Sequence, residues 1–187
     1  MSECEAFLDS MFMDLDKGRY RNYAELEKYM YGSAAVIGLM VTRVVGYHSD
    51  DAFPYAEQLG YAFQLTNFLR DIQEDSQGLM RIYMPQDELR KFGISEEEIL
   101  AGVCGDKFKR FMRFQIERNR DVYRKALPGI SLLKWRGRLA VKISYVLYKE
   151  ILAEIEKADY DVFKGRVRTN FRQKLSLSLK ALIGIYE

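Results

Sequence analysis

The sequence predicts an all-α protein built from long antiparallel helices. Only three of its 187 residues are proline, and no stretch alternates apolar and polar residues as a half-buried strand does. Apolar residues make up 48% of the chain and aromatic residues 13%, which is enough to bury a core and excludes a disordered protein. No repeat and no change in composition marks a boundary, so we expect one helical domain over residues 1–187.

The content of charged residues, histidine and cysteine excludes several function classes. The 29 basic residues nearly balance the 27 acidic ones, and a net charge of +2 gives no support to a nucleic-acid-binding surface. His48 is the single histidine, which leaves little scope for histidine-based catalysis. Cys4 and Cys104 fit no metal or disulfide pattern, which suits a reducing compartment. The chain shows no signal peptide, and its longest apolar or small run, residues 32–41, is too short to span a bilayer.

Capping signals and chain breakers divide the sequence into helices. The first helix is expected over residues 3–17, with no N-cap before it and with Phe7, Met11 and Leu15 on one face. Asn22 and Glu25 have the spacing of a capping box, which predicts a helix that runs on to Tyr47. Later helices are expected at residues 52–75, capped by Asp50 or Asp51, at 85–92, after the capping box of Ser95 and Glu98, and at 106–127, 135–157 and 171–186.

The second predicted helix contains an unusual run of small residues, YMYGSAAVIGLM, at positions 29–40. Small residues allow two helices to approach closely, and they equally leave room for a long ligand to pass between helices. Taken alone, the run favours close packing over a ligand channel.

The stretch that carries the chemistry is residues 59–87. Its inner part places Gln64, Asn67, Asp71 and Asp75 in one row of a helix that is otherwise largely apolar. Carboxylates and carboxamides on a buried helix are costly unless something compensates them. Mg²⁺ can do so, because it is commonly bound by one or two carboxylates together with substrate phosphates. An acidic pair alone is more often a solvated face, so it is the amides beside the pair that favour a metal.

Arginine and tyrosine accompany this row. Arg70 precedes Asp71, and Arg81 and Tyr83 follow in a polar loop after Asp75, from which they can fold back over whatever the carboxylates hold. The guanidinium fork matches the oxygens of a phosphate group. A capped helix end followed by a turn would also gather polar residues, but it does not explain why they occupy the apolar side. The sequence therefore predicts a site for Mg²⁺ and a phosphate group.

QLTNFLRDIQED followed by RIYMPQDEL closely resembles the second aspartate-rich motif of the squalene/phytoene synthase family. YMYGSAAVIGLM resembles the substrate helix of that family, and RGRLAVKISYVLYKEILAEIEKADYDVF and RVRTNFRQKLSLSLKALI are similar to its C-terminal helices. The resemblance covers nearly the whole chain. It implies an isoprenoid synthase-type bundle of long antiparallel helices around a central cleft, and a head-to-head prenyltransferase that looks more like bacterial or archaeal phytoene synthases than eukaryotic squalene synthases.

The resemblance also implies roles for individual residues. Asn67, Asp71 and Asp75 would bind Mg²⁺, which Mn²⁺ could replace, and Asp71, Asp75, Arg81 and Tyr83 would form the catalytic set. The substrate-binding set that it implies consists of Tyr29, Ser33, Ile37, Gly38, Gly60, Phe63, Gln64, Asn67, Arg70 and Tyr148.

The implied reaction joins two prenyl diphosphates. Metal-assisted loss of diphosphate from an allylic substrate leaves a cation, which alkylates a second prenyl diphosphate to a cyclopropyl intermediate that ionises and rearranges. We expect geranylgeranyl diphosphate as substrate and phytoene as product, without NADPH; squalene or dehydrosqualene formation from farnesyl diphosphate is the alternative. Because long prenyl chains are insoluble in water, we expect a cytoplasmic protein held peripherally at the membrane, with no nucleic-acid partner.

The chain departs from the family pattern in two places. Family members carry an earlier aspartate-rich motif on a helix that faces the second motif, and this chain has none; Asp14 and Asp16 are two residues apart and point to different faces, so they cannot replace it. The segment from Asp75 to Arg81 is one residue longer than the family spacing and has SQG in place of a basic pair.

These departures leave three hypotheses. The chain is expected to lack the N-terminal helices of a phytoene synthase-like enzyme, either as a truncated product or as one half of a split enzyme that an N-terminal chain completes in trans. Apolar surface left exposed could also drive self-association. The alternative is a non-catalytic helical scaffold that kept the fold and lost the chemistry.

Overall fold

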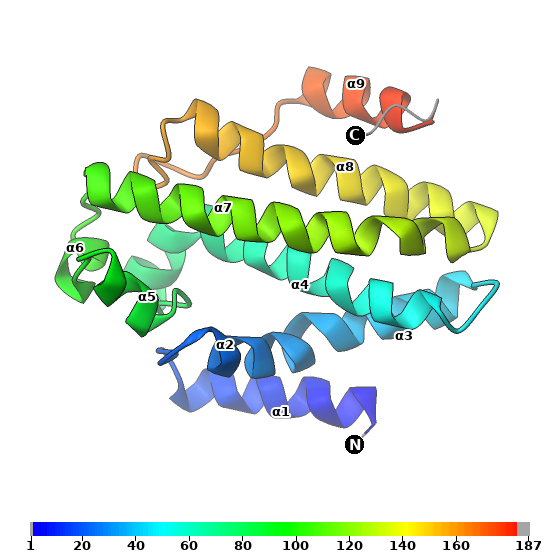
Figure 1. The fold of residues 1–187 in the computed structure, drawn as a ribbon, viewed down its shortest axis with the longest axis horizontal. Helices are drawn as coiled ribbons and strands as arrows, with labels where there is room; N and C mark the ends of the chain where they lie inside the picture. The colour runs from blue at the N-terminus through cyan, green and yellow to red at the C-terminus, as the bar shows by residue number, and fades with distance from the viewer. Residues whose placement is uncertain (1, 183–187) are drawn as a thin grey trace.

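The structure is a computed structural model that describes residues 2–182. Figure 1 shows long helices stacked side by side. They are α1 (Glu3–Asp16), α2 (Tyr23–Met30), α3 (Val36–Val45), α4 (Ala52–Arg70), α5 (Gln86–Lys91), α6 (Glu96–Leu100), α7 (Asp106–Ala126), α8 (Trp135–Lys157) and α9 (Phe171–Leu182), with π-helical turns at Tyr31–Ala35 and Glu74–Gly78 and a 3₁₀ turn at Leu127–Leu132. Residues 2–182 contain isolated β-bridges and no β-strand, which confirms the predicted all-α class.

Helix α4 is the central element of the bundle. It packs against α3 on one side and against α7 and α8 on the other (Figure 1). Helices α7 and α8 contribute large side chains to the core, since Phe108, Phe111, Met112, Tyr145 and Leu152 are all fully buried. Because α4 is covered on several sides, its apolar residues are buried nearly all round, as the sequence indicated.

Helix α1 corrects the prediction of an uncapped start and shows where its large apolar residues lie. Its start is capped, because the Ser2 hydroxyl accepts from the backbone N–H of Glu5 and the Glu5 carboxylate accepts from the N–H of Ser2 at 2.8 Å. The predicted apolar face is not a core face: Met11 and Leu15 are 36% and 76% exposed. The buried face instead carries Ala6, against whose carbonyl oxygen a Cβ added at Gly32 would lie at only 2.3 Å. Small residues permit this close approach, so they decide which face of α1 is buried.

The predicted helix from Asn22 to Tyr47 is divided by the π-helical turn Tyr31–Ala35, and its last α-helical residue lies two positions earlier than predicted. The Asn22 side chain caps α2 by accepting from the N–H of Glu25 at 2.9 Å. The capping box is incomplete, because the Glu25 carboxylate pairs with Lys17 at 2.9 Å instead. The capping box of Ser95 and the predicted bounds of α8 are confirmed. The end predicted for the last helix, at residues 183–186, lies outside the described residues.

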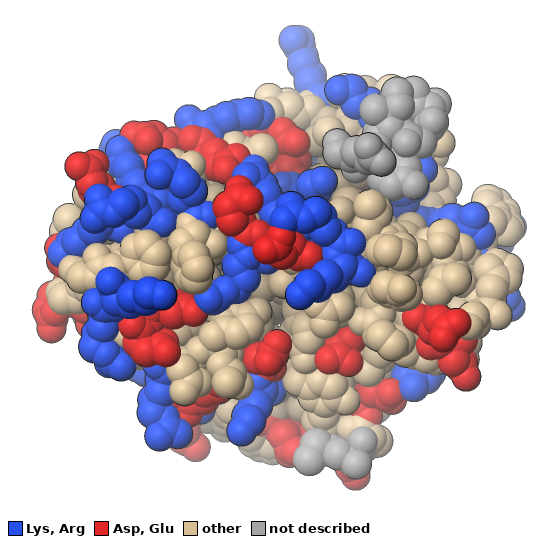
Figure 2. Space-filling model, viewed as in Figure 1, with Lys and Arg blue, Asp and Glu red and all other residues tan. Residues whose placement is uncertain are grey.

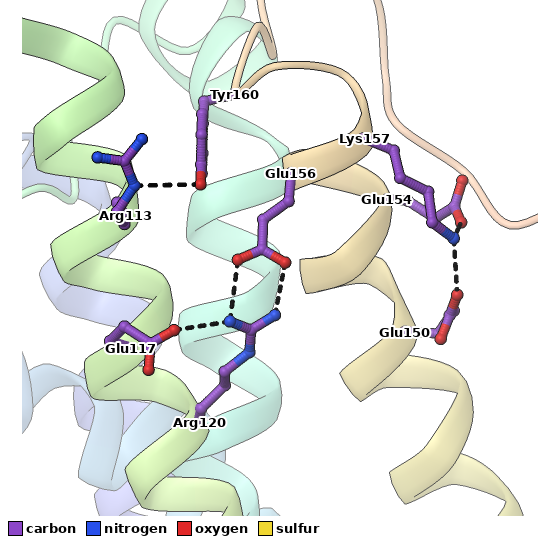
Figure 3. A network of polar contacts seen from close by, with 8 residues as sticks. All are labelled: Arg113, Glu117, Arg120, Glu150, Glu154, Glu156, Lys157 and Tyr160. Atoms are coloured by element: carbon purple, nitrogen blue, oxygen red, sulfur yellow. Dashed lines mark hydrogen bonds and ion pairs between the residues drawn. The ribbon is translucent and has the colours of Figure 1, made fainter.

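An ion network joins α7 to α8 (Figure 3). Arg120 of α7 makes a bidentate pair with Glu156 of α8, at 2.9 and 2.6 Å, and also bonds to Glu117 at 2.6 Å. About two turns before Arg120 on α7, Arg113 donates to the Tyr160 hydroxyl at 3.3 Å. Pairs that remain in contact with solvent contribute only about 0–1 kcal/mol each, so the network sets the register of the two helices more than their stability.

The surface carries both signs of charge. Figure 2 shows acidic and basic side chains intermixed over one face of the molecule, in keeping with the near-neutral net charge. Among residues 2–182, no helix combines the length and the hydropathy that crossing a bilayer requires.

Candidate functional site

A cavity of about 380 Å³ lies between α3, α4, α8 and the 3₁₀ turn at 127–132, within the range of ~300–1,000 Å³ typical of ligand pockets. Its wall is mostly apolar. Ile37 and Val41, which are 36% and 42% exposed, lie where the wall meets solvent. Of the predicted substrate-binding residues, the following line the cavity: Ser33, Ile37, Gly38, Gly60, Phe63 and Gln64.

Glycine holds α3 and α4 together beside this cavity. A Cβ added at Gly38 would lie 2.4 Å from the carbonyl oxygen of Ala56, and one at Gly60 would lie 2.6 Å from that of Ala34. Backbone atoms cannot rotate away from such a contact, so the close-packing interpretation of the small residues is confirmed. The same residues line the cavity, so the packing and the channel are not exclusive.

The polar row extends from the end of α4 into the turn that follows. Asp71 is the C-cap residue of α4, and Asp75 lies in the π-helical turn Glu74–Gly78, so the row is not one uninterrupted helix as predicted. Asp75 nevertheless stays one turn after Asp71, because its N–H bonds to the carbonyl of Asp71 at 2.8 Å as in an α-helix. The π-helical turn replaces part of the predicted loop, and the N–H of Arg81 bonds to the carbonyl of Asp75 at 2.8 Å.

Two arginines hold the Asp71 carboxylate. Arg70 donates to both of its oxygens, at 2.7 and 2.5 Å, and this hydrogen bonding raises the pKa of the guanidinium. Arg166, from the segment between α8 and α9, donates to the same carboxylate from Nε at 2.9 Å and lies 3.8 Å from Glu74. Sequence reasoning missed Arg166, which is 95 residues from Asp71 and whose only signal was the basic segment KGRVRTN.

Burial is unfavourable for two oxygen-bearing side chains beside Asp71, those of Asp75 and Asn67. Burial, reinforced by the charges of Asp71 and Glu74, raises the pKa of Asp75 from 3.8 to about 7. The side-chain oxygen Oδ1 of Asn67 is buried with no hydrogen bond, which is costly unless a ligand satisfies it. Residues 2–182 contain no group of three His, Cys, Asp or Glu side chains that could hold a metal unaided. A cation here would need phosphate or water ligands as well, which is how Mg²⁺ is usually bound.

Tyr29 and Tyr83 lie in an aromatic stack at this polar end and do not line the cavity. Their ring centroids are 5.7 Å apart, and Phe68 stacks on Tyr83 at 4.2 Å. Burial raises the pKa of both tyrosines, so both hydroxyls keep the protons that they donate to Asp14 of α1, at 2.9 and 3.4 Å. Arg81 donates to the backbone carbonyl of Asp14 at 2.6 Å. Asp14, to which the sequence analysis assigned no role, therefore positions three predicted site residues.

Tyr148 of α8 does not line the cavity but packs against a residue of its wall. Its ring centroid lies 4.5 Å from that of Phe63, which lines the cavity directly. The predicted site thus divides into an apolar compartment and a polar end that share α4. This arrangement is suited to an amphiphilic ligand with a long apolar chain and an anionic head.

Comparisons with known proteins identify the family of the chain. The chain belongs to the squalene/phytoene synthase family, whose model matches residues 1–173. It is 40% identical over 174 residues to a chloroplastic phytoene synthase of an Oncidium hybrid cultivar, covering 90% of this chain and 42% of the relative. It is 39% identical over 180 residues to the 15-cis-phytoene synthase of Synechococcus elongatus, covering 90% of this chain and 58% of the relative.

The solved structures confirm the isoprenoid synthase-type bundle. A dehydrosqualene synthase superposes with a TM-score of 0.88 at 24% identity, over 95% of this chain and 62% of that chain. A squalene synthase from Alicyclobacillus acidocaldarius superposes with a TM-score of 0.79 at 25% identity, over 84% of this chain and 59% of that chain. The chain spans about half the length of the curated relatives that it matches.

Proposed function

We propose that this chain contributes the prenyl- and diphosphate-binding site of a Mg²⁺-dependent head-to-head prenyltransferase that converts geranylgeranyl diphosphate to phytoene. The observation that carries the proposal is the division of α4. Its first part lines the apolar cavity through Gly60, Phe63 and Gln64, and its last turn and C-cap present Asn67 and Asp71. One helix therefore supplies surface for the prenyl chain and polar groups for the diphosphate. The names of the relatives, which are phytoene synthases, support this choice of substrate.

The polar end would hold the diphosphate through a cation and through arginine. Asn67, Asp71 and Asp75 would bind Mg²⁺, or Mn²⁺ in its place, and their oxygen donors fit a hard divalent cation. When bound, the metal neutralises the charge of the leaving diphosphate. Arg70 and Arg166 lie on Asp71 and offer paired N–H donors to diphosphate oxygens.

The aromatic residues would surround the reacting carbon. Phe63, which lines the cavity and is backed by Tyr148, presents an electron-rich ring face that attracts a cation. The rings of Tyr29, Phe68 and Tyr83, which stack on one another at the polar end, would close that end of the site. The apolar wall of the cavity keeps water away from a reactive allylic cation. The hydroxyls of Tyr29 and Tyr83 remain turned to Asp14 and so keep the ring faces fixed. No NADPH is needed for phytoene formation.

The proposal includes a membrane as the source of substrate and the destination of product. Long prenyl chains partition into bilayers, so we expect peripheral contact of a cytoplasmic protein with a membrane surface. The plant relatives are named chloroplastic, which is said of those proteins alone.

The test is turnover of the protein with Mg²⁺ and either geranylgeranyl or farnesyl diphosphate, read out by mass spectrometry of the hydrocarbon product. Phytoene supports the proposal, and product from farnesyl diphosphate alone would change the substrate to the shorter chain. A second arm adds, as a separate polypeptide, the portion of the Synechococcus elongatus relative that this chain does not match. Product only in that arm would mean that a second segment completes the site. Absence of product in both arms would favour the scaffold hypothesis.

A further inference from the structure

Helix α9 presents a row of large apolar side chains to solvent. It lies at the edge of the bundle and packs on α8 (Figure 1). One face of α9 is anchored by Ala181, which is fully buried, and by Leu177, which packs against the core. The exposed row, called here the α9 ridge, consists of Phe171, Leu175, Leu179 and Leu182, which are 78%, 53%, 54% and 49% exposed.

The α9 ridge is continuous along the helix. Its members are spaced by four, four and three residues, which places them within a narrow arc of one helical face. At 1.5 Å per residue, a helix of this length is roughly 18 Å long. Single exposed apolar residues are common on protein surfaces, but a row of four large ones along one helix marks an interaction surface.

The α9 ridge also lies in the most basic part of the chain. Between positions 164 and 182 there is no Asp or Glu, whereas six cations occur there: Lys164, Arg166, Arg168, Arg172, Lys174 and Lys180. On a helical projection, Arg172 and Lys174 flank the ridge on its two sides. Both are exposed, and neither forms an ion pair with another residue of the described chain.

The helix that carries the ridge is held in place from both its start and its inner face. The Asn170 side chain accepts from the N–H of Gln173 at 2.9 Å, and the Gln173 side chain accepts from the N–H of Asn170 at 2.7 Å. Gln173 also donates to Glu154 of α8 at 2.9 Å. These bonds fix the rotation of α9, so the ridge faces outward because of its anchoring.

We propose that α9 lies in the surface of a bilayer that contains anionic lipid, with the ridge among the acyl chains and the flanking cations at the headgroups. An apolar face flanked by Lys and Arg is the pattern of helices that bind at the membrane interface. The charge decides between occupants: a second copy of this chain would bring the same uncompensated cations to the contact, whereas anionic headgroups neutralise them. This proposal rests on the membrane contact in the proposed function and names the surface that makes it.

The test is sedimentation of the protein with vesicles of phosphatidylcholine alone or mixed with phosphatidylglycerol. We expect binding to the mixed vesicles and little binding to pure phosphatidylcholine. The double variant Leu175→Glu/Leu179→Glu should bind roughly 100-fold more weakly, because each withdrawn leucine removes roughly a factor of ten. The matched control is Leu8→Glu/Phe12→Glu on α1, two residues that are 54% and 65% exposed, and it should bind like the parent.

A second variant keeps the ridge intact and removes its charges. Arg172→Gln/Lys174→Gln should weaken binding to the mixed vesicles by roughly fivefold per cation and leave binding to neutral vesicles unchanged. Circular dichroism checks that each variant is folded.

The proposal is overturned if the parent protein does not bind the anionic vesicles, or if the ridge variant binds them as well as the α1 control does. A ridge variant that dissociates a dimer in solution, with vesicle binding unaltered, would instead assign the ridge to a second copy of the chain. Turnover measured in detergent separates this test from that of the proposed function. A protein that makes no product in detergent can still bind vesicles, and a protein that does not bind vesicles can still make product in detergent.

Discussion

Replacing Gly60 by alanine tests the contact between α4 and the π-helical turn Tyr31–Ala35, which meet beside the cavity. The added Cβ would lie 2.6 Å from the carbonyl oxygen of Ala34 and 2.9 Å from the Cα of Ala35. These are backbone atoms of a helical segment, so no side-chain rotation relieves the contact, and α4 must move away from the segment opposite.

The expected cost follows from two opposing terms. Alanine is favoured over glycine within a helix by about 1 kcal/mol, so a Gly→Ala change without steric conflict should stabilise the protein. Overpacking a tight contact costs roughly 1–3 kcal/mol, and a conflict with backbone belongs to the upper part of that range. We therefore expect Gly60→Ala to lower the free energy of unfolding by roughly 1–2 kcal/mol, which for a protein of this size lowers Tm by roughly 2–8 °C.

The assay is thermal and urea unfolding followed by far-ultraviolet circular dichroism. Gly78→Ala is the matched control, because a Cβ at Gly78 would meet no atom within 4 Å. The control should have the stability of the parent or slightly more. If Gly60→Ala were as stable as Gly78→Ala, the backbone contact between the two segments could not be as close as the structure has it.

Three further predictions concern the polar end and the core behind it. Asp71→Asn should abolish turnover in the complete enzyme without unfolding it, because it removes a carboxylate proposed to hold the metal. The pKa of Asp75 is about 7 in the folded protein and 3.8 in the unfolded chain, so the folded state binds the proton more tightly. The folded protein therefore loses stability as the pH rises from 3.8 to about 7, whereas the Asp75→Asn variant does not. The Tm of Asp75→Asn relative to the parent should increase between pH 5 and pH 8 in metal-free buffer. Thr66→Val should cost about 1–3 kcal/mol in urea unfolding, because it leaves the fully buried Tyr123 hydroxyl and Asn119 amide without their shared partner.

Each of these has a control on the same chain. Asp16→Asn, an exposed change on α1, should keep full turnover, and an active Asp71→Asn protein would contradict the metal assignment. A Tm difference for Asp75→Asn that does not change with pH would contradict the raised pKa. Thr42→Val is the control for Thr66→Val, since the Thr42 hydroxyl donates only within its own helix, to Gly38, and the two variants should differ in stability.

The parts of the fold that depend on local spacing could be predicted from the sequence. The bounds of α8 and the caps at Asn22 and Ser95 depend on residues within a few positions of one another. The failures occurred where a distant contact outweighed local preference. On α1 the large apolar residues face solvent, because Ala6 is small enough to meet Gly32 and so sets the buried face.

The local sequence predicts the polar row of the candidate site, because helical spacing alone places Gln64, Asn67, Asp71 and Asp75 on one face. Only the tertiary structure decided what meets that row. Arg166 donates to Asp71, which is 95 residues away in the sequence. The Tyr83 hydroxyl donates to Asp14, which is 69 residues away, and no local pattern indicates either contact. The physical reason is that such contacts depend on how α1 and the segment after α8 fold back on α4, and periodicity records which face of a helix is buried but not what lies opposite.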